Sequence, residues 1–394
     1  MKTVLFAWEL GGGKGHITTL SRLAKRLQHL DLRFVAVVKS PDAAGALSEL
    51  GVEIVQAPLW PSASMTDAQI AKSSSSTMGD VLATAGLADR QGLSRLLGEW
   101  DRHFARIRPD LVVADLAPAA GLAARGRIPL MLVGNGYTLP PAEMQRFPPL
   151  HQISPPASAE QETLSVVNAV LQGRGQARLD RLPQVFAADA RLVLTFPLLD
   201  PYGLQRVEPV DGPVLDEVPR ASDPDAGTIF AYLSREYRLH RDIPAAFRAV
   251  APRLRIHAPG LSDAQAGELR QAGAIVEVEP VQPANALASA RLIVHYGGGG
   301  LAAEALAAGV PQLVLSMQVE QDLNGSALLR AGLGRLIRAY DPASRIDAKT
   351  IDELFRDNIL AQQAREAGRK HREWLGCADT LAKFESKGRE LLRI

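Results

Sequence analysis

The chain has a single cysteine, Cys377, among its 394 residues. One cysteine excludes an internal disulfide and is typical of a reducing compartment, so we expect a cytoplasmic protein. The formal net charge is only +1, which gives no electrostatic reason to expect nucleic acid as a partner. We find no basic-then-apolar signal segment, and no apolar run approaches the ~20 residues of a membrane span. With 46% hydrophobic residues, the chain has the composition of a globular protein.

Short apolar runs alternate with longer helical segments, and this alternation occurs twice along the chain. Continuous Val/Ile/Leu runs between helices indicate parallel sheets that are covered on both faces. Residues 196–227 separate the two sets; they are rich in Pro, Asp and Gly, lack periodicity and are typical of a linker. The expected strands are Thr3–Ala7, Phe34–Val38, Glu53–Gln56, Leu111–Ala114, Leu130–Val133, Leu192–Thr195, Thr228–Leu233, Arg255–Ala258, Ile275–Val278, Leu292–His295, Gln312–Leu315 and Arg335–Arg338. The sequence therefore predicts an α/β protein with two doubly wound, Rossmann-like domains.

A run of four glycines, Gly297–Gly300, joins an expected strand ending at His295 to a helix. Glycines let the backbone approach a ligand closely, and the N–H groups at the start of the helix suit a phosphate. The alternative is an ordinary tight turn. A second glycine-rich loop, Glu9–His16, follows the first strand. Its spacing fits neither a G-x-G-x-x-G dinucleotide loop nor a Walker A loop.

The sequence that continues from His295 resembles the donor-binding signature of nucleotide-sugar-dependent glycosyltransferases with the GT-B fold. It is most similar to the bacterial family-1 and macrolide-type, UDP-glycosyltransferase-like enzymes. Their pattern reads His-x-Gly-Gly-x-Gly-Thr-x-x-Glu-Ala-Leu-x-x-Gly-Val-Pro, followed by an acidic residue and Gln. The chain departs from it at Leu301, where the family has Thr. It matches at His295, Gly297, Gly298, Gly300, Glu304, Ala305, Leu306, Gly309, Val310, Pro311, Glu320 and Gln321.

The resemblance implies a donor site in the second half of the chain. The diphosphate would meet His295, Gly298, Gly299, Gly300 and Ser234, the last of which follows the first strand of that half. Glu304 would hold the ribose, the backbone of Val281 the base, and Glu320 with Gln321 the sugar hydroxyls. Carboxylates and amides are natural partners for such hydroxyls. The alternatives are an acid that complements the helix dipole at Glu304 and a polar helix start at Glu320 and Gln321.

In the first half, the Gly-His at the end of the loop resembles the family's general base. His16 would remove the proton of the acceptor hydroxyl, because a helix N-terminus disfavours the imidazolium. Asp115, at the end of a strand, would orient the ring. The alternatives are a capping or phosphate-contacting role for His16 and an N-cap role for Asp115. Four further residues are candidates for an apolar acceptor mouth, or alternatively for simple packing: Tyr137, Met144, Phe147 and His151.

The resemblance implies two Rossmann-like domains facing a central cleft: an acceptor-binding domain over residues 1–205, a donor-binding domain over 206–375, and a C-terminal helix over 376–394 that returns to the first. The implied reaction is metal-independent, inverting transfer of a hexose-type sugar from a UDP- or dTDP-sugar to a hydroxyl of a small-molecule, lipid or saccharide acceptor. No cofactor besides this co-substrate is expected, and no side-chain cluster has zinc-site spacing. The alternatives are a nucleotide-sugar 2-epimerase-like enzyme and a non-catalytic sugar-nucleotide-binding subunit. We expect a monomer or homodimer, and a solvated basic surface on the last helices, with a peripheral membrane contact as the alternative.

Overall fold

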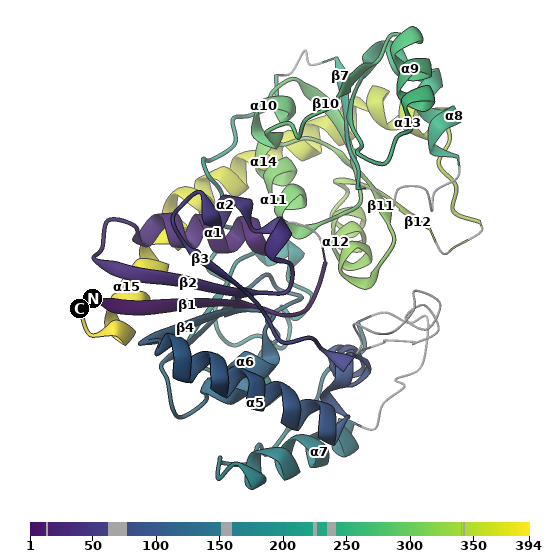
Figure 1. Ribbon diagram of the computed structural model, residues 1–394. Coiled ribbons are helices and arrows are strands. Elements are labelled where there is room, and N and C mark those ends of the chain that lie inside the picture. The colour runs from purple at the N-terminus through teal and green to yellow at the C-terminus, as the bar shows by residue number, and fades with distance from the viewer. Residues whose placement is uncertain are drawn as a thin grey trace. The chain divides into compact units, whose positions relative to one another are not determined.

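The computed structural model describes residues 1–12, 15–61, 77–150, 160–223, 227–234, 242–339, 341 and 343–394 (Figure 1). These residues form two compact units. The first unit contains residues 1–195, 200–214 and 379–394, and the second contains residues 196–199 and 215–378. The sequence places the boundaries after residues 205 and 375, whereas the chain passes between the units after residues 195, 199, 214 and 378.

The first unit is built on a parallel sheet with the strand order β3-β2-β1-β4-β5-β6. The central strands β1 and β4 are neighbours, and their register pairs Trp8 with Asp115. Because the carboxyl ends of parallel strands meet at one edge, the loops that follow β1 and β4 begin side by side. The strands are β1 (Lys2–Trp8), β2 (Leu32–Val38), β3 (Glu53–Gln56), β4 (Leu111–Asp115), β5 (Leu130–Gly134) and β6 (Ala190–Val193).

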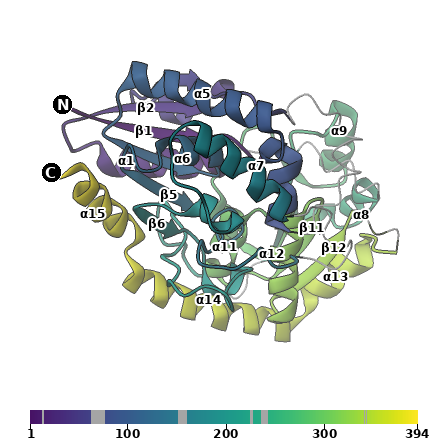
Figure 2. The same cartoon turned by 90° about the horizontal axis from the view of Figure 1, so that it is seen from below.

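Helices cover both faces of this sheet, which explains why its central strands are apolar throughout. One face packs on a core cluster with Trp100 and Phe186, and the other on a cluster with Phe6 and Phe384. Helices α5, α6 and α7 lie on the first face (Figures 1 and 2), and α1 contacts α15 on the second. The helices are α1 (Gly15–Leu27), α2 (Gly45–Ser48), α4 (Met78–Leu82), α5 (Arg90–Ile107), α6 (Pro118–Ala124), α7 (Glu160–Gly173) and α15 (Thr380–Leu392).

The second unit repeats this plan with a parallel sheet in the order β12-β11-β10-β7-β8-β9. Its strands are β7 (Thr228–Tyr232), β8 (Leu254–His257), β9 (Ile275–Glu277), β10 (Ala290–His295), β11 (Gln312–Ser316) and β12 (Gly334–Arg338). Its helices are α8 (Ile243–Ala249), α9 (Asp263–Gln271), α10 (Pro283–Leu287), α11 (Gly299–Ala308), α12 (Val319–Arg330), α13 (Ala348–Arg356) and α14 (Asn358–Ala378). The α/β class and both doubly wound sheets are confirmed, and every expected strand is found within two residues of its expected ends.

The expected linker, residues 196–227, contains the passages between the units after residues 199 and 214, but its first part is buried. Phe196 is fully buried in the second unit, where its ring packs edge-on against His371 at 4.6 Å. Tyr202 is fully buried in the first unit. Pro, Asp and Gly content reports local turn formation, and it does not reveal that single large side chains between the turns enter a core.

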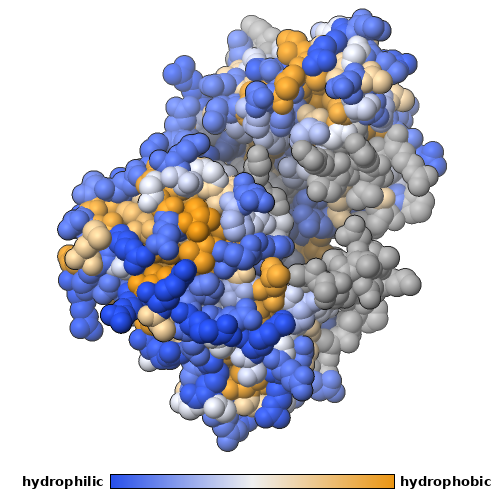
Figure 3. Space-filling view, viewed as in Figure 1, coloured by the Kyte–Doolittle hydropathy of each residue, from blue (hydrophilic) through white to orange (hydrophobic). Residues whose placement is uncertain are grey.

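The surface of the described residues is mixed in character. None of their helices is long and apolar enough to cross a membrane. In the space-filling view, hydrophilic residues cover much of the visible face, with smaller apolar patches between them (Figure 3). On α14 the basic residue Arg369 is paired with Glu366 and Glu373 at 3.0 and 2.6 Å. Such pairs within one exposed helix are typical of a solvated surface.

Candidate active site

His16 and Asp115 form a hydrogen-bonded pair at the carboxyl edge of the first sheet. His16 lies in the first turn of α1 and Asp115 is the last residue of β4. The two are 2.9 Å apart, from Nδ1 of the ring to Oδ2 of the carboxylate. Since a carboxylate only accepts, this bond requires a proton on Nδ1 of His16. The indole of Trp8 stacks on the imidazole at 5.3 Å and fixes the plane of the ring.

The alternative role of Asp115 as a helix cap is not what the structure shows. The N-cap of α6 is Ala117, and no side chain at that position caps the helix. Asp115 is only 3% exposed, and its Oδ1 has no hydrogen-bond partner among the described residues. The carboxylate is therefore committed to the ring of His16.

Gly11 allows the imidazole to lie where it does. Its φ is +82°, and a Cβ added there would lie 2.5 Å from Nε2 of His16. The carbonyl of Gly11 accepts a 2.8 Å hydrogen bond from Nζ of Lys39, which ties this loop to the end of β2. Gly13 and Lys14, in the same loop, lie outside the described residues.

A small pocket opens beside Asp115, at the carboxyl ends of β4 and β5. Its walls are almost entirely apolar and include Leu116, Ala117, Leu132 and Phe186. Its single polar side chain is that of Thr138, which is 2% exposed. The Oγ1 of Thr138 has no partner within the described ranges. Its volume is about 10 Å³, room for about one water molecule, so it is a gap in the packing and not an acceptor site by itself.

The structure places Met144 and Phe147, two residues expected at an apolar acceptor mouth, inside the hydrophobic core. Their side chains are 7% and 2% exposed and belong to the hydrophobic core. Phe147 packs edge-on against Phe186 at 6.1 Å. Tyr137 is half-buried against the same core, and His151 lies outside the described residues. The segment is apolar because it packs, which is the alternative that the sequence left open.

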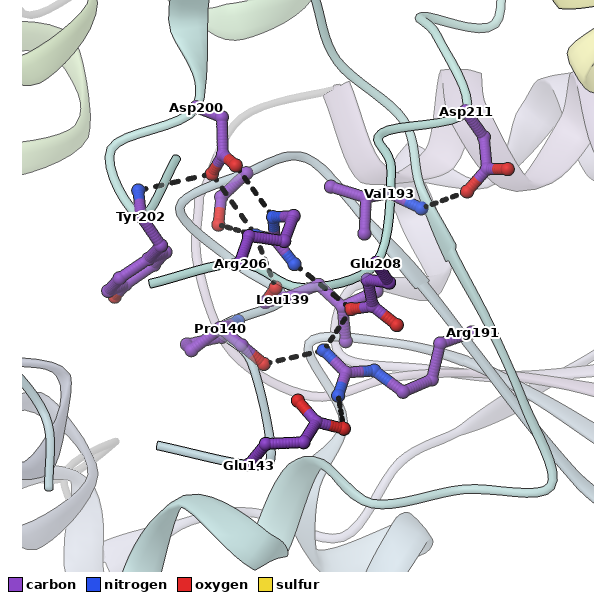
Figure 4. Close-up of polar contacts among 11 residues, drawn as sticks. Leu139, Pro140, Glu143, Arg191, Val193, Asp200, Tyr202, Arg206, Glu208 and Asp211 are labelled. Carbon is purple, nitrogen blue, oxygen red and sulfur yellow. Dashed lines mark hydrogen bonds and ion pairs between the residues drawn. The ribbon is translucent and has the colours of Figure 1, made fainter. Parts of the chain in front are cut away.

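Buried ion pairs hold this segment in place (Figure 4). Arg206 pairs with Asp200 at 2.6 Å, both almost fully buried, and donates to the carbonyl of Leu139 at 3.1 Å. Arg191 donates to the carbonyl of Pro140 at 2.7 Å. Glu208 lies between the two arginines, at 3.1 Å from Arg206 and 2.9 Å from Arg191. The two guanidinium groups thus satisfy backbone carbonyls of the segment that follows β5.

The glycine loop of the second unit turns sharply between β10 and α11. Gly297 has a φ of +83°, and a Cβ there would lie 2.7 Å from Val314 and 2.9 Å from the Gln321 carbonyl. Asn324 donates to the carbonyl of Gly297 at 2.8 Å. The helix α11 has Gly298 as its N-cap and no capping side chain. Its first-turn N–H groups, from Gly299 onward, therefore lack helical acceptors and suit an anion.

The structure places His295, which is expected to contact the diphosphate, beneath the glycine loop. The ring is fully buried; it lies 2.9 Å from Oε1 of Gln312 through Nε2, and its Nδ1 accepts from the N–H of Gly297 at 3.2 Å. Burial lowers the pKa of His295 to about 4, against the raising effect of the hydrogen bond to Gln312. His295 therefore supports the turn from beneath as a neutral ring, because it is the last residue of the strand and not the first of the loop.

The other expected donor residues occupy different surroundings. Glu304 lies in α11 and is 8% exposed. Ser234 follows β7, and its Oγ is buried without a partner in the part of the chain described. Gln321 is buried, and its Oε1 accepts from the Met317 N–H at 2.8 Å, so this oxygen caps the turn before α12. Glu320 is half-buried at the start of α12, and Val281 packs beside the cluster of β7, β10 and α11 residues.

Two residues that the sequence analysis did not single out lie at the carboxyl ends of β7 and β8. The rings of Tyr232 and His257 are 5.0 Å apart. Burial raises the pKa of Tyr232, and the charge of Glu304 raises it further. His257 is 5% exposed, and its Nδ1 has no partner among the described residues. Polar residues that end two adjacent parallel strands are the signal that identifies them.

Metal ligands are not assembled in the described ranges. No group of three or more His, Cys, Asp or Glu side chains there is arranged to hold a metal ion.

No protein-family model matches the chain. It is 28% identical over 152 residues to the zeaxanthin glucosyltransferase of Pseudescherichia vulneris, which covers 38% of this chain and 37% of that protein. It is 34% identical over 103 residues to the elloramycin glycosyltransferase of Streptomyces olivaceus, which covers 26% of this chain and 25% of that protein. The chain thus matches well under half of the length of these two curated relatives.

Solved structures are similar over almost the whole chain. The calicheamicin glycosyltransferase superposes with a TM-score of 0.70 at 20% identity, covering 99% of this chain and 98% of that one. The spinosyn rhamnosyltransferase in complex with thymidine diphosphate gives 0.62 at 18% identity, covering 94% and 96%. The same rhamnosyltransferase is also solved with the spinosyn aglycone. The chain therefore has the GT-B fold of these glycosyltransferases.

Proposed function

We propose that the protein is an inverting glycosyltransferase that moves a hexose-type sugar from a UDP- or dTDP-sugar to a hydroxyl of an apolar acceptor. The observation that carries this proposal is the pair of His16 and Asp115, 2.9 Å apart at the edge of the first sheet. An imidazole whose Nδ1 donates to a carboxylate is an arrangement suited to general-base catalysis.

In the proposed reaction, Nε2 of His16 takes the proton of the acceptor hydroxyl as its oxygen attacks the anomeric carbon of the donor. The bond from that carbon to the diphosphate oxygen breaks, and its electron pair leaves with the nucleoside diphosphate. Attack from the face opposite the leaving group inverts the anomeric configuration. Asp115 keeps the ring in the required tautomer and stabilises the imidazolium that forms.

The leaving diphosphate would be stabilised by the N–H groups of Gly299 and Gly300 at the start of α11, where negative charge develops. Ser234 offers a further hydroxyl from the end of β7. Glu304 is proposed to hold the ribose, the backbone of Val281 the base, and Glu320 the sugar hydroxyls. No metal or organic cofactor is part of this proposal.

An apolar acceptor is proposed from the names of the two curated relatives, a zeaxanthin glucosyltransferase and an elloramycin glycosyltransferase. A small molecule with a largely apolar skeleton and a hydroxyl is therefore the acceptor to test first.

The test is product analysis with UDP- and dTDP-sugars and a panel of apolar alcohols. We expect release of the nucleoside diphosphate together with a glycoside of inverted anomeric configuration, determined by NMR. His16→Ala should abolish turnover while nucleotide binding by thermal shift is retained. An epimerised nucleotide sugar formed without acceptor would favour the epimerase alternative. Nucleotide binding without turnover in the wild type would favour the non-catalytic subunit.

A further inference from the structure

A buried carboxylate follows Trp8, the residue that stacks on the ring of the proposed base, and the proposed reaction does not use it. Glu9 is the residue after β1 and is only 3% exposed. Its Oε1 accepts from Nε1 of Trp100 at 2.5 Å, and its Oε2 accepts from the backbone N–H groups of Ala119 at 2.8 Å and Ala120 at 3.4 Å. Its burial keeps it from any substrate, so its role is exerted through the residues that it holds.

The ionised form of the Glu9 carboxyl destabilises the folded state. Burial raises the pKa of Glu9 to about 7, although the hydrogen bonds from Trp100, Ala119 and Ala120 lower it. A neutral apolar residue at this position in the core would avoid that cost. The three contacts explain why a carboxylate is needed instead: an indole N–H and two backbone N–H groups only donate, so the partner must accept at both oxygens.

Through these contacts Glu9 supplies the cap that α6 lacks. Ala119 and Ala120 are the second and third residues of α6, whose own N-cap, Ala117, has no side-chain oxygen. The first N–H groups of a helix require acceptors from elsewhere when no cap is present. Glu9 reaches them from β1 and so ties the start of α6 to the strand that leads into the loop of His16.

The tied segment contains a strained residue next to Asp115. Leu116 has a φ of 43°, in the left-handed region that side chains other than glycine rarely adopt. Its carbonyl accepts from the N–H of Leu10 at 3.1 Å. Two adjacent residues of one loop, Glu9 and Leu10, therefore hold the two sides of the turn that follows Asp115. Directly before this loop, at the end of β1, Trp8 stacks against His16 at 5.3 Å.

We propose that Glu9 is a positioning residue for the His16–Asp115 pair: by anchoring the start of α6 it holds the strained Leu116 turn in the conformation that aims Asp115 at His16. The consequence for turnover rests on the proposed transferase function. The consequence for the geometry of the pair does not, and the two are measured separately.

Glu9→Gln tests this inference with the least change in shape. The amide nitrogen cannot accept, so it would oppose a donor, either Nε1 of Trp100 or the N–H of Ala119. We expect the start of α6 to shift and the bond between Asp115 and His16 to weaken. The readout is ¹⁵N NMR of the histidine rings, assigned with a His16→Gln variant. In the wild type the His16 proton resides on Nδ1, and in Glu9→Gln it redistributes toward Nε2.

The matched control is Asp110→Asn. Asp110 accepts from the N–H of Thr3 at 2.8 Å. It therefore links β1 to the residue before β4, at the edge of the sheet opposite to His16 and Asp115. At pH 8 we expect Glu9→Gln to lower kcat by about tenfold to a hundredfold, with KM for the donor unchanged. Asp110→Asn should leave the His16 ring spectrum and kcat at their wild-type values.

A wild-type His16 spectrum in folded Glu9→Gln overturns the inference, as does an equal change in Asp110→Asn. If Glu9→Gln fails to fold, the variant to use is Trp100→Phe, which removes one hydrogen-bond donor to Glu9 and keeps an aromatic ring in the core. An unchanged His16 spectrum in Trp100→Phe also overturns the inference. A shifted spectrum in a protein that transfers no sugar from any donor supports the positioning role and refutes the proposed function.

Discussion

Replacing Gly11 by alanine tests the geometry of the proposed base most directly. The added Cβ would lie 2.5 Å from Nε2 of His16, whereas ordinary contacts begin near 3.4 Å. The ring must therefore move by about 1 Å, and the 2.9 Å bond to Asp115 cannot survive in its present form. A displacement of that size in a catalytic group lowers the rate by about a hundredfold.

The same substitution strains the backbone, because Gly11 has a φ of +82°. A side chain in the left-handed region costs about 1–2 kcal/mol. In a unit of this size, that loss lowers the unfolding midpoint by roughly 2–8 °C. Gly11→Ala is thus expected to remain folded at 25 °C, so a loss of turnover in this variant would not be due to unfolding.

Gly12→Ala is the control for this prediction, since a Cβ there meets nothing within 4 Å and the φ is not positive. The assay is release of nucleoside diphosphate at saturating donor and acceptor, with thermal unfolding followed in parallel. We expect Gly12→Ala to turn over like the wild type. Wild-type kcat in Gly11→Ala, or an equal loss in both variants, would refute the placement of His16 beside this loop.

Three further predictions concern the pair, the ribose contact and pH. Asp115→Asn should lower kcat by about a hundredfold or more, because an amide favours the wrong tautomer of His16, while calorimetry shows unchanged nucleotide binding; a kcat within threefold of the wild type would exclude Asp115 as the orienting group. Glu304→Gln should weaken UDP or dTDP binding by about tenfold but leave the affinity for inorganic pyrophosphate unchanged, and equal losses for both ligands would contradict a ribose role. The two units should respond oppositely to pH. Unfolded His295 binds a proton below pH 6.5, but the buried ring does so only below about pH 4, so the second unit loses up to about 3 kcal/mol as the pH falls through this window. Glu9 keeps its proton up to about pH 7 when folded but releases it from 4.5 when unfolded, so the first unit loses up to about 3 kcal/mol as the pH rises from 4.5 to 7. Denaturation series in which His295→Gln and Glu9→Gln fail to flatten these slopes would refute both assignments.

The order of strands and helices could be predicted because the signals are local. A buried parallel strand is apolar on both faces, so runs such as Leu111–Ala114 are visible without knowledge of their neighbours. Glycines at a positive φ, such as Gly297, mark the turn at the end of a strand. The pairing of His16 with Asp115 could also be predicted, because both residues lie at the carboxyl ends of central strands and such strand ends meet at one edge of the sheet.

The chain by itself therefore determined the α/β class, the two glycine loops and the residues that end the central strands. The tertiary structure alone decided which polar residues face outward. His295 and Glu9 both lie at strand ends in the sequence. In the structure, the ring of His295 is buried beneath the loop beside Gln312, and the carboxylate of Glu9 is buried between Trp100 and α6. Phe147 likewise enters the core instead of an open mouth. Burial of a side chain depends on segments that lie far away along the chain, and no local pattern contains that information.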